Sequence, residues 1–207
     1  MKSLIGTLLI LLISIPTYAG MVGQIQTEWA YAMYRAPTDQ RVDLLIKLAD
    51  QARSEAKLDS DNAELLIWQG IVLSTLAGEK GGLGALSLAK EAKKSLEKAI
   101  ELDPTAMDGS AMTSLGTLYH KIPGWPIGFG SDKKANALLE ESLTLNPHGI
   151  DVNYFFGEFL YDEGDYADAK QRLLTAKQAA PRKSRPIADA GRHKEIEKLL
   201  ALVEKEL

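Results

Sequence analysis

The sequence predicts an all-α fold, a right-handed solenoid of helix pairs that ends in a C-terminal closing helix. Three observations support this prediction. Three segments share one spacing of small and large residues, each has a glycine upstream, and each is followed by a proline. The shared residues are Ala92, Leu96 and Ala99, then Ala135, Leu139 and Ser142, then Ala169, Leu173 and Ala176, with Gly70, Gly116 and Gly157 upstream and Pro104, Pro147 and Pro181 downstream.

The repeated glycines indicate a packing constraint. A two-helix unit cannot bury both of its helices alone, so it must stack on a neighbouring unit. Glycine inside a helix costs roughly 1 kcal/mol relative to alanine. Its return in the same register at Gly70, Gly116 and Gly157 therefore favours close helix crossings. The alternative is an ordinary amphipathic bundle in which this spacing is a coincidence.

The last segment shows a complete repeat, with 34 residues from Pro147 to Pro181. This pattern resembles the tetratricopeptide repeat, a helix–turn–helix unit of that period. The resemblance implies three clear repeats, preceded by one degenerate repeat with helices at residues 22–35 and 41–58. It also implies that the first helix of each pair lines a concave face, on which extended peptides or helices bind.

A closing helix is predicted at residues 186–206. Ile196, Leu199, Leu200 and Val203 share one face of this helix, and charged residues occupy the other. A polar outer face at the end of a stack is what solubility requires.

Two of the repeats are longer than the last one, with surplus residues at 78–84 and 124–130. We expect both as loops between paired helices, where insertions often mark the binding face. In the second, Trp125, Ile127 and Phe129 alternate with proline and glycine. Either these side chains fold back over the helix ends as a plug, or Trp125 and Phe129 form a lid at the mouth of the groove.

The predicted groove residues lie beside the packing glycines on the first helices. Carboxylate-clamp repeats hold a peptide terminus with Lys, Arg and Asn on this face, and the present chain has no such set. That specificity is therefore not carried over. The candidates are Ile67, Ile71 and Ser74, then Thr113, Thr117 and His120, then Tyr154, Glu158 and Tyr161.

Residues 1–19 have the pattern of a secretory signal peptide: Lys2, an apolar run over 4–15, and small residues before a cleavage site after Ala19. This run is shorter than the roughly 20 residues that span a bilayer. We expect residues 20–207 to form a single domain that is periplasmic or secreted and has no stable membrane anchor. An uncleaved anchor is the alternative.

Composition and motifs exclude several functions. The chain has no cysteine, so disulfides and thiolate metal sites are absent. A net charge of -4 without a basic stripe argues against a nucleic-acid partner. The locally basic residues 182–185 and 192–194 form either an exposed helix junction or a contact for an anionic partner. The three histidines have no second ligand at metal spacing, and no catalytic constellation is present. We therefore predict no metal, no cofactor and no enzymatic activity.

The expected function is a non-enzymatic adaptor that binds a protein or peptide partner in the periplasm through its concave face. The alternative is a small-ligand binder, because the layout is similar to that of the helical-repeat component of tripartite periplasmic import systems. The two hypotheses differ in one observable. A small apolar ligand is favoured if Trp125, Phe129, Tyr154 and Tyr161 enclose a cavity, and a peptide or protein partner is favoured if they face an open trough.

Overall fold

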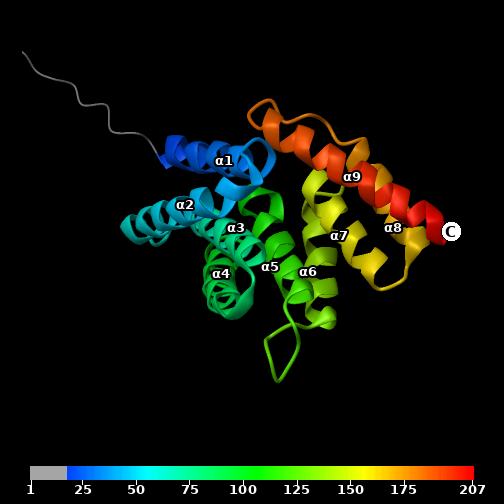
Figure 1. Cartoon of the computed structure of the whole chain (residues 1–207), viewed down its shortest axis with the longest axis horizontal. Helices are drawn as coiled ribbons and strands as arrows, with labels where there is room; N and C mark the ends of the chain where they lie inside the picture. The colour runs from blue at the N-terminus through cyan, green and yellow to red at the C-terminus, as the bar shows by residue number, and fades with distance from the viewer. Residues whose placement is uncertain (1–17) are drawn as a thin grey trace, which may run out of the picture.

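The computed structural model describes residues 18–207, and within that range it contains nine α-helices, one short 3-10 turn and no strand (Figure 1). This arrangement confirms the prediction of an all-α solenoid of helix pairs. The elements are α1 (Tyr18–Tyr34), α2 (Thr38–Leu58), α3 (Ala63–Lys80), α4 (Gly82–Leu102), η1 (Ala106–Gly109), α5 (Ser110–Lys121), α6 (Asp132–Leu145), α7 (Ile150–Asp162), α8 (Tyr166–Lys177) and α9 (Pro186–Glu206).

The three clear repeats are the pairs α3–α4, α5–α6 and α7–α8. In each pair a buried glycine on the first helix faces a leucine on the second, and an added Cβ atom would collide with it. The glycines are therefore required by packing, as predicted. The distances from the added Cβ to the leucine Cγ are 2.5 Å for Gly70 and Leu96, 3.0 Å for Gly116 and Leu139, and 2.9 Å for Gly157 and Leu173.

The end elements also follow the prediction. The helices α1 and α2 stand where the degenerate repeat was expected, and Pro37 separates them. The closing helix α9 spans Pro186–Glu206, and its four predicted inward residues are buried. They pack against α7 and α8, which α9 covers.

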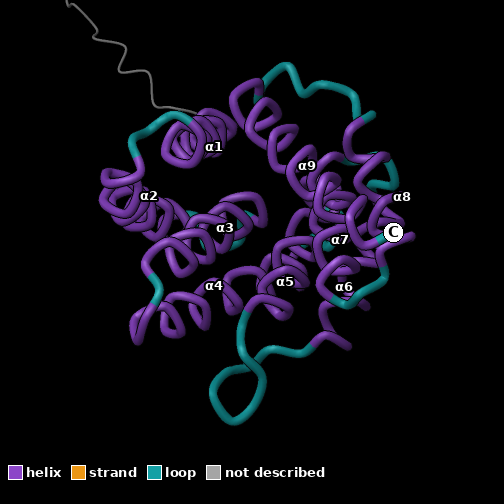
Figure 2. The backbone as a smooth tube through the Cα atoms, turned by 45° about the vertical axis from the view of Figure 1, so that its right-hand side comes forward, coloured by secondary structure: helices purple, strands orange, loops and turns teal. Residues whose placement is uncertain are grey.

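The prediction of two inserted loops is right for one segment and wrong for the other. Residues 122–131 form a loop that projects away from the helices (Figure 2). The surplus at residues 78–84 instead lengthens two helices: α3 has 18 residues and α4 has 21, whereas α5 has 12 and α6 has 14. Leu76 and Ala77 directly before the surplus residues are buried, and α3 continues past them to Lys80. Left-handed backbone at Gly81 and Gly82 then reverses the chain within a very short turn.

The stack curves until its two ends meet. The helix α1 packs on α2 and α3, and its end also contacts the start of α9, so the first and last helices meet (Figures 1 and 2). Gly191 permits this approach, because a Cβ there would lie 2.3 Å from the Tyr34 ring. The Tyr34 hydroxyl donates a hydrogen bond to Glu195 Oε2 at 3.2 Å. The concave side is therefore bounded by α1 and α9 as well as by the repeats.

Candidate functional site

A groove of about 740 Å³ lies on the concave side of the stack. Its walls come from α1, α3, α5 and α7, from the connection between α8 and α9, and from the start of α9. The four wall helices α1, α3, α5 and α7 are the first members of their pairs. The volume falls in the range of roughly 300–1,000 Å³ that is typical of ligand sites.

One end of the groove is apolar and is built from α1 and α3. The Trp29 ring packs edge-on against Trp68, with ring centroids 5.9 Å apart, and Ile71 extends the wall along α3. Trp29 Nε1 donates a hydrogen bond to Thr75 Oγ1 at 3.0 Å. Trp68 Nε1 has no acceptor, although its side chain is only 1% exposed. Trp29, Trp68 and Ile71 are termed the apolar end.

A second, adjoining part of the groove is charged and centres on Asp151 in the first turn of α7. Arg182 Nη1 donates to Asp151 Oδ2 at 2.6 Å, and Arg192 Nε donates to Asp151 Oδ1 at 3.0 Å. Arg185 Nη1 lies farther away, 3.7 Å from Asp151 Oδ2. Asp151 and these three arginines are termed the charged end. They bring together α7, the connection between α8 and α9, and α9 itself.

The three arginines do not share the carboxylates equally. Arg182 Nε also donates to Asp189 Oδ1 at 2.8 Å, and Arg192 Nη1 donates to Glu195 Oε2 at 2.6 Å. Arg185 has no second carboxylate of this kind, and its buried Nε has no hydrogen-bond partner. Arg185 is therefore the least satisfied cation of the charged end.

The electrostatics agree with this geometry. Burial alone would raise the pKa of Asp151, but the three arginines outweigh it and hold that pKa well below its usual range. Burial also lowers the pKa of each arginine. Nearby acidic groups reverse the effect at Arg182 and Arg192, where the pKa is raised, but not at Arg185, where it stays lowered.

Aromatic rings hold two of the arginines in place. The Arg192 guanidinium lies 4.3 Å from the ring centroid of Tyr154 and 4.4 Å from that of Phe155. The Arg185 guanidinium lies 5.1 Å from the Trp68 ring centroid. Stacking of this kind favours cations. Arg185 therefore connects the charged end of the groove to the apolar end.

A left-handed turn forms another part of the wall. Met107, Asp108 and Gly109 have φ angles of 50°, 56° and 77°, and the first two line the groove. Left-handed backbone costs roughly 1–2 kcal/mol for each residue with a Cβ. Ser142 Oγ holds the turn by donating to the Gly109 carbonyl at 3.1 Å. Backbone strain of this kind is often found at functional sites.

Four of the nine predicted groove residues line the groove, namely Ile71, Ser74, Thr113 and Thr117. Thr113 is 5% exposed, and its hydroxyl already shares a hydrogen bond with Ser142. The threonine and serine positions therefore contribute a small polar floor between the apolar and charged ends.

The other predicted positions lie elsewhere. Ile67 is wholly buried in the core. Tyr154 belongs to the cluster between α7, α8 and α9, and Tyr161 packs against Tyr166 at the edge of that cluster. The physical reason is that α9 covers this face of α7, which the repeat pattern alone did not indicate. His120 and Glu158 take part in a separate ionic cluster.

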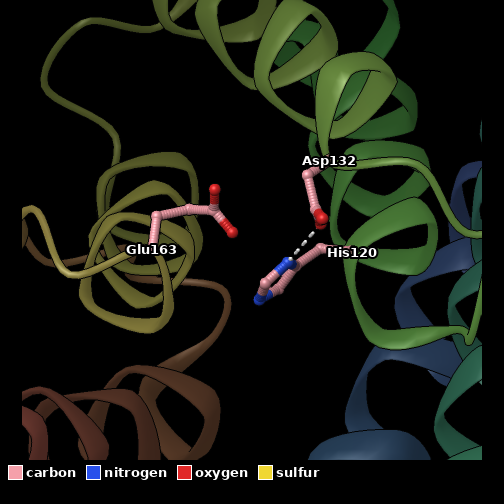
Figure 3. A group of neighbouring side chains, drawn as sticks. All are labelled: His120, Asp132 and Glu163. Carbon is pink, nitrogen blue, oxygen red and sulfur yellow. Dashed lines mark hydrogen bonds and ion pairs between the residues drawn. The ribbon is translucent and has the colours of Figure 1, made fainter.

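This ionic cluster lies at the C-terminal end of α5 (Figure 3). His120 Nδ1 is 3.1 Å from Asp132 Oδ1, and His120 Nε2 is 2.8 Å from Asp162 Oδ2. Lys121 Nζ completes the cluster, 2.8 Å from Asp162 and 3.3 Å from Glu158. Both nitrogens of His120 are therefore already paired with carboxylates.

The same cluster offers a donor set for a metal ion. One ligand atom each from His120, Asp132 and Glu163 lies within 4.8 Å of the others (Figure 3). Imidazole with carboxylates is a ligand combination that divalent transition metals accept. Sequence spacing did not reveal these partners, because they come from α5, α6 and the turn after α7. The absence of a metal site therefore stays a prediction, and the existing ion pairs satisfy His120 without one.

The loop residues do not reach the groove. Trp125 is 91% exposed and Ile127 is 71% exposed, so the plug interpretation is wrong for these two. Phe129 does fold back, because its ring packs edge-on against Tyr119 at 5.7 Å. Gly130 explains the outward course of the loop: a Cβ there would lie 1.8 Å from the Ile122 carbonyl oxygen, so the base of the loop is closed tightly.

None of the four aromatic residues proposed to enclose a ligand lines the groove. Trp125 and Phe129 belong to the projecting loop, and Tyr154 and Tyr161 belong to the cluster beneath α9. These four residues therefore do not form a common cavity.

The expectation of an exposed basic junction is wrong for three residues. Arg192 is 6% exposed, and Arg182 and Arg185 are partly buried, because all three turn inward toward Asp151. Lys183 in the same segment stays exposed. The acid that pairs with these arginines is 31 residues from Arg182 and 41 from Arg192, so local sequence did not show it.

Sequence reasoning also missed several wall residues on α3. Trp68, Thr75 and Gly78 line the groove together with Ile71. They stand three residues before, four after and seven after that isoleucine. Side chains at such spacings share one helix face. Following the α-helical spacing in both directions from Ile71 would have identified these residues.

Comparison with known proteins relates the C-terminal part of this chain to a known family. Residues 133–201, from α6 to α9, match the family model described as tetratricopeptide repeat. The glycine–leucine contact of the matched pairs recurs upstream in α3–α4. The packing of the upstream pair is therefore similar to that of the matched repeats.

Two individual proteins are similar to this chain. The type IV pilus assembly protein PilF of Pseudomonas aeruginosa (strain PAO1) is 31% identical over 114 residues, which are 53% of this chain and 42% of that protein. The chain thus spans less than half the length of this relative. A solved structure, the crystal structure of MamA protein, has 18% identity and a TM-score of 0.44, covering 90% of this chain and 92% of the other.

No α-helix within residues 18–207 combines the length and the apolar character that crossing a membrane requires.

Proposed function

We propose that this protein is a non-enzymatic adaptor that holds an extended segment of a protein partner in the groove between α1, α3, α5 and α7. The single observation that carries this proposal is the groove itself. It is formed by the first helix of each pair, and it contains both an apolar end and a charged end. First helices of such stacks commonly bind peptides.

The nature of the relative supports a protein partner. PilF is named for pilus assembly, a process in which protein subunits are brought together. We propose that the present chain likewise contributes to the assembly of a protein complex, with a partner of its own.

We further propose that the protein acts in the periplasm after removal of residues 1–19. Most of that segment, residues 1–17, lies outside the described residues. The first buried residues of α1 are Val22 and Ile25, which follow Ala19. Cleavage after Ala19 would remove the first two residues of α1 and keep Val22 and Ile25, so we propose that residues 20–207 function as one unit. N-terminal sequencing of the protein from a periplasmic fraction should begin at Gly20, whereas a start at Met1 would contradict export with cleavage.

Site-specific crosslinking tests the adaptor proposal. A photoreactive amino acid is placed at Ser74 in the groove wall, or at Lys94, which is exposed on α4. We expect a protein adduct from the Ser74 position in cells and none, or a different one, from Lys94. Equal adducts from both positions, or no protein adduct from the groove, would contradict the proposal.

A small-ligand binder remains the second candidate, because a groove of about 740 Å³ suits such ligands. Native mass spectrometry of the protein purified from its own compartment distinguishes the two. A bound mass of a few hundred daltons that is lost on denaturation would favour the small ligand.

A further inference from the structure

Arg185 occupies the point where the two ends of the groove meet, and the following inference rests on the proposed binding of a protein segment there. Its guanidinium lies 5.1 Å from the Trp68 ring centroid, on the apolar end, and its Nη1 lies 3.7 Å from Asp151 Oδ2, on the charged end. The side chain lines the groove and is 16% exposed. It is thus positioned to contact a bound molecule.

Two hydrogen-bond donors at this point have no partner. They are Arg185 Nε and Trp68 Nε1, and both atoms are buried. Neither side chain can accept a hydrogen bond, because guanidinium and indole groups are donors only. A buried donor left unpaired costs about 1–3 kcal/mol. Within residues 18–207, Arg185 therefore keeps an incompletely paired guanidinium.

The charge of Arg185 points to an anionic acceptor. The carboxylate of Asp151 is already engaged at shorter distances by Arg182 and Arg192. Arg185 is the arginine of this group with no carboxylate nearer than 3.7 Å.

The surroundings favour a carboxylate on a peptide over an inorganic anion. The apolar side chains of Ile71 and Phe155 line the same groove, and they offer contact to the apolar neighbours of an acidic residue. The groove is also lined by Gln26 on α1 and Lys121 on α5, so it is larger than the surroundings of Arg185 alone.

We propose that Arg185 binds the carboxylate of an aspartate or glutamate side chain within an extended segment of the protein partner. The Nη groups of the guanidinium donate to the carboxylate oxygens, while apolar residues beside the acid pack on the apolar end. Such pairing is geometrically specific, because the guanidinium fork matches a carboxylate.

Selection from a display library of short random peptides, fused so that neither terminus is free, tests this assignment. The purified protein serves as bait. We expect enriched sequences to place an acidic residue next to apolar ones. Replacing that acid by its amide should weaken binding to the wild-type protein roughly 10- to 100-fold.

Two variants locate the effect. Arg185→Gln should lower the affinity for the acidic peptide by a similar factor. This variant should bind the acidic and amide peptides with equal affinity. Lys183→Gln removes the same charge from an exposed residue of the same segment and should change neither affinity. Melting temperatures show whether each variant is folded. If Arg185→Gln does not fold, Arg185→Lys provides the comparison, since it keeps the charge but loses the fork and should bind the acidic peptide more weakly.

Each other result has a definite meaning. The assignment to Arg185 is overturned if the enriched peptides have no acidic position. It is also overturned if Arg185→Gln and the wild type show the same ratio of affinities for the acidic and amide peptides. Either result leaves the adaptor function standing. Dependence on a free C-terminal carboxylate instead of a side chain would overturn it as well. Failure to enrich any peptide would overturn both proposals.

Discussion

The two ends of the groove are built on different physical principles. The apolar end consists of Trp29, Trp68 and Ile71, which are positioned by ring packing and by burial against the core. The charged end depends on the balance of three guanidinium groups against Asp151 and two further carboxylates. Removal of one apolar side chain leaves a space, whereas removal of one charge leaves its partners unpaired in a poorly solvated site. The charged end should therefore be the more sensitive of the two.

The largest effect is expected from Asp151→Ala. This change leaves Arg182, Arg185 and Arg192 without their common acceptor, and breaking a buried ion pair in this way costs about 3–5 kcal/mol. Urea denaturation followed by circular dichroism measures the loss. The matched control is Asp168→Ala in the exposed first turn of α8, which should cost less than about 1 kcal/mol. Equal losses would show that the charged end has no special role in stability.

Acid should weaken the charged end before it affects the apolar end. The folded-state pKa of Asp151 lies below that of the unfolded chain, about 3.9. Its contribution to stability is therefore fully present above that value and is lost as the pH falls through it toward the folded pKa. We expect the urea midpoint to fall steeply below about pH 4. In Asp151→Asn the urea midpoint should no longer fall steeply below about pH 4. An unchanged pH dependence of the midpoint would contradict the role given to Asp151.

A smaller effect separates the two tryptophans of the apolar end. Trp29 Nε1 donates to Thr75, whereas Trp68 Nε1 has no partner. Trp29→Phe should therefore cost about 1 kcal/mol more than Trp68→Phe, because only the first loses a hydrogen bond. Thermal denaturation of the two variants tests this difference. The reverse order would mean that Trp68 has a partner in solution.

The smallest effect is expected outside both ends, at Trp125. Its side chain is 91% exposed on the projecting loop, so Trp125→Ala should change the free energy of unfolding by no more than about 0.5 kcal/mol. Phe129→Ala in the same loop should cost roughly 2 kcal/mol, because it removes packing on Tyr119. Chemical denaturation of both variants measures these changes. A large loss in Trp125→Ala would restore the plug interpretation.

Local periodicity in the sequence predicts much of the fold. Gly157, Ala169 and Leu173 meet at one helix crossing, and residues that must touch in every pair recur at fixed spacing. The closing helix was predictable for the same reason, from Ile196 to Val203. Because the same contacts recur in every repeat, the sequence spacing alone indicates which residues of paired helices touch.

The two surplus segments show where this reasoning fails. Both are rich in glycine, yet residues 78–84 extend two helices while 122–131 form a loop. The distinction is that the first segment contains no proline, whereas the prolines of the second segment cannot continue a helix. Glycine content alone does not separate these outcomes.

The candidate site was only partly predictable. Ile71, Ser74, Thr113 and Thr117 follow from the helix period. The arginines do not, because their orientation depends on Asp151, more than thirty residues away in sequence. Pairing of charges across elements is decided by the three-dimensional path of the chain, and no local pattern encodes it.

The contact between Tyr34 and Gly191 has a consequence for how the protein opens. In a linear array of repeats, the terminal units have a neighbour on one side only, and they detach first. Here the end of α1 contacts the start of α9, so neither of these two helix ends can detach without losing its contact with the other. Amide protons in the last turn of α1 should accordingly exchange with solvent as slowly as those of the central α5.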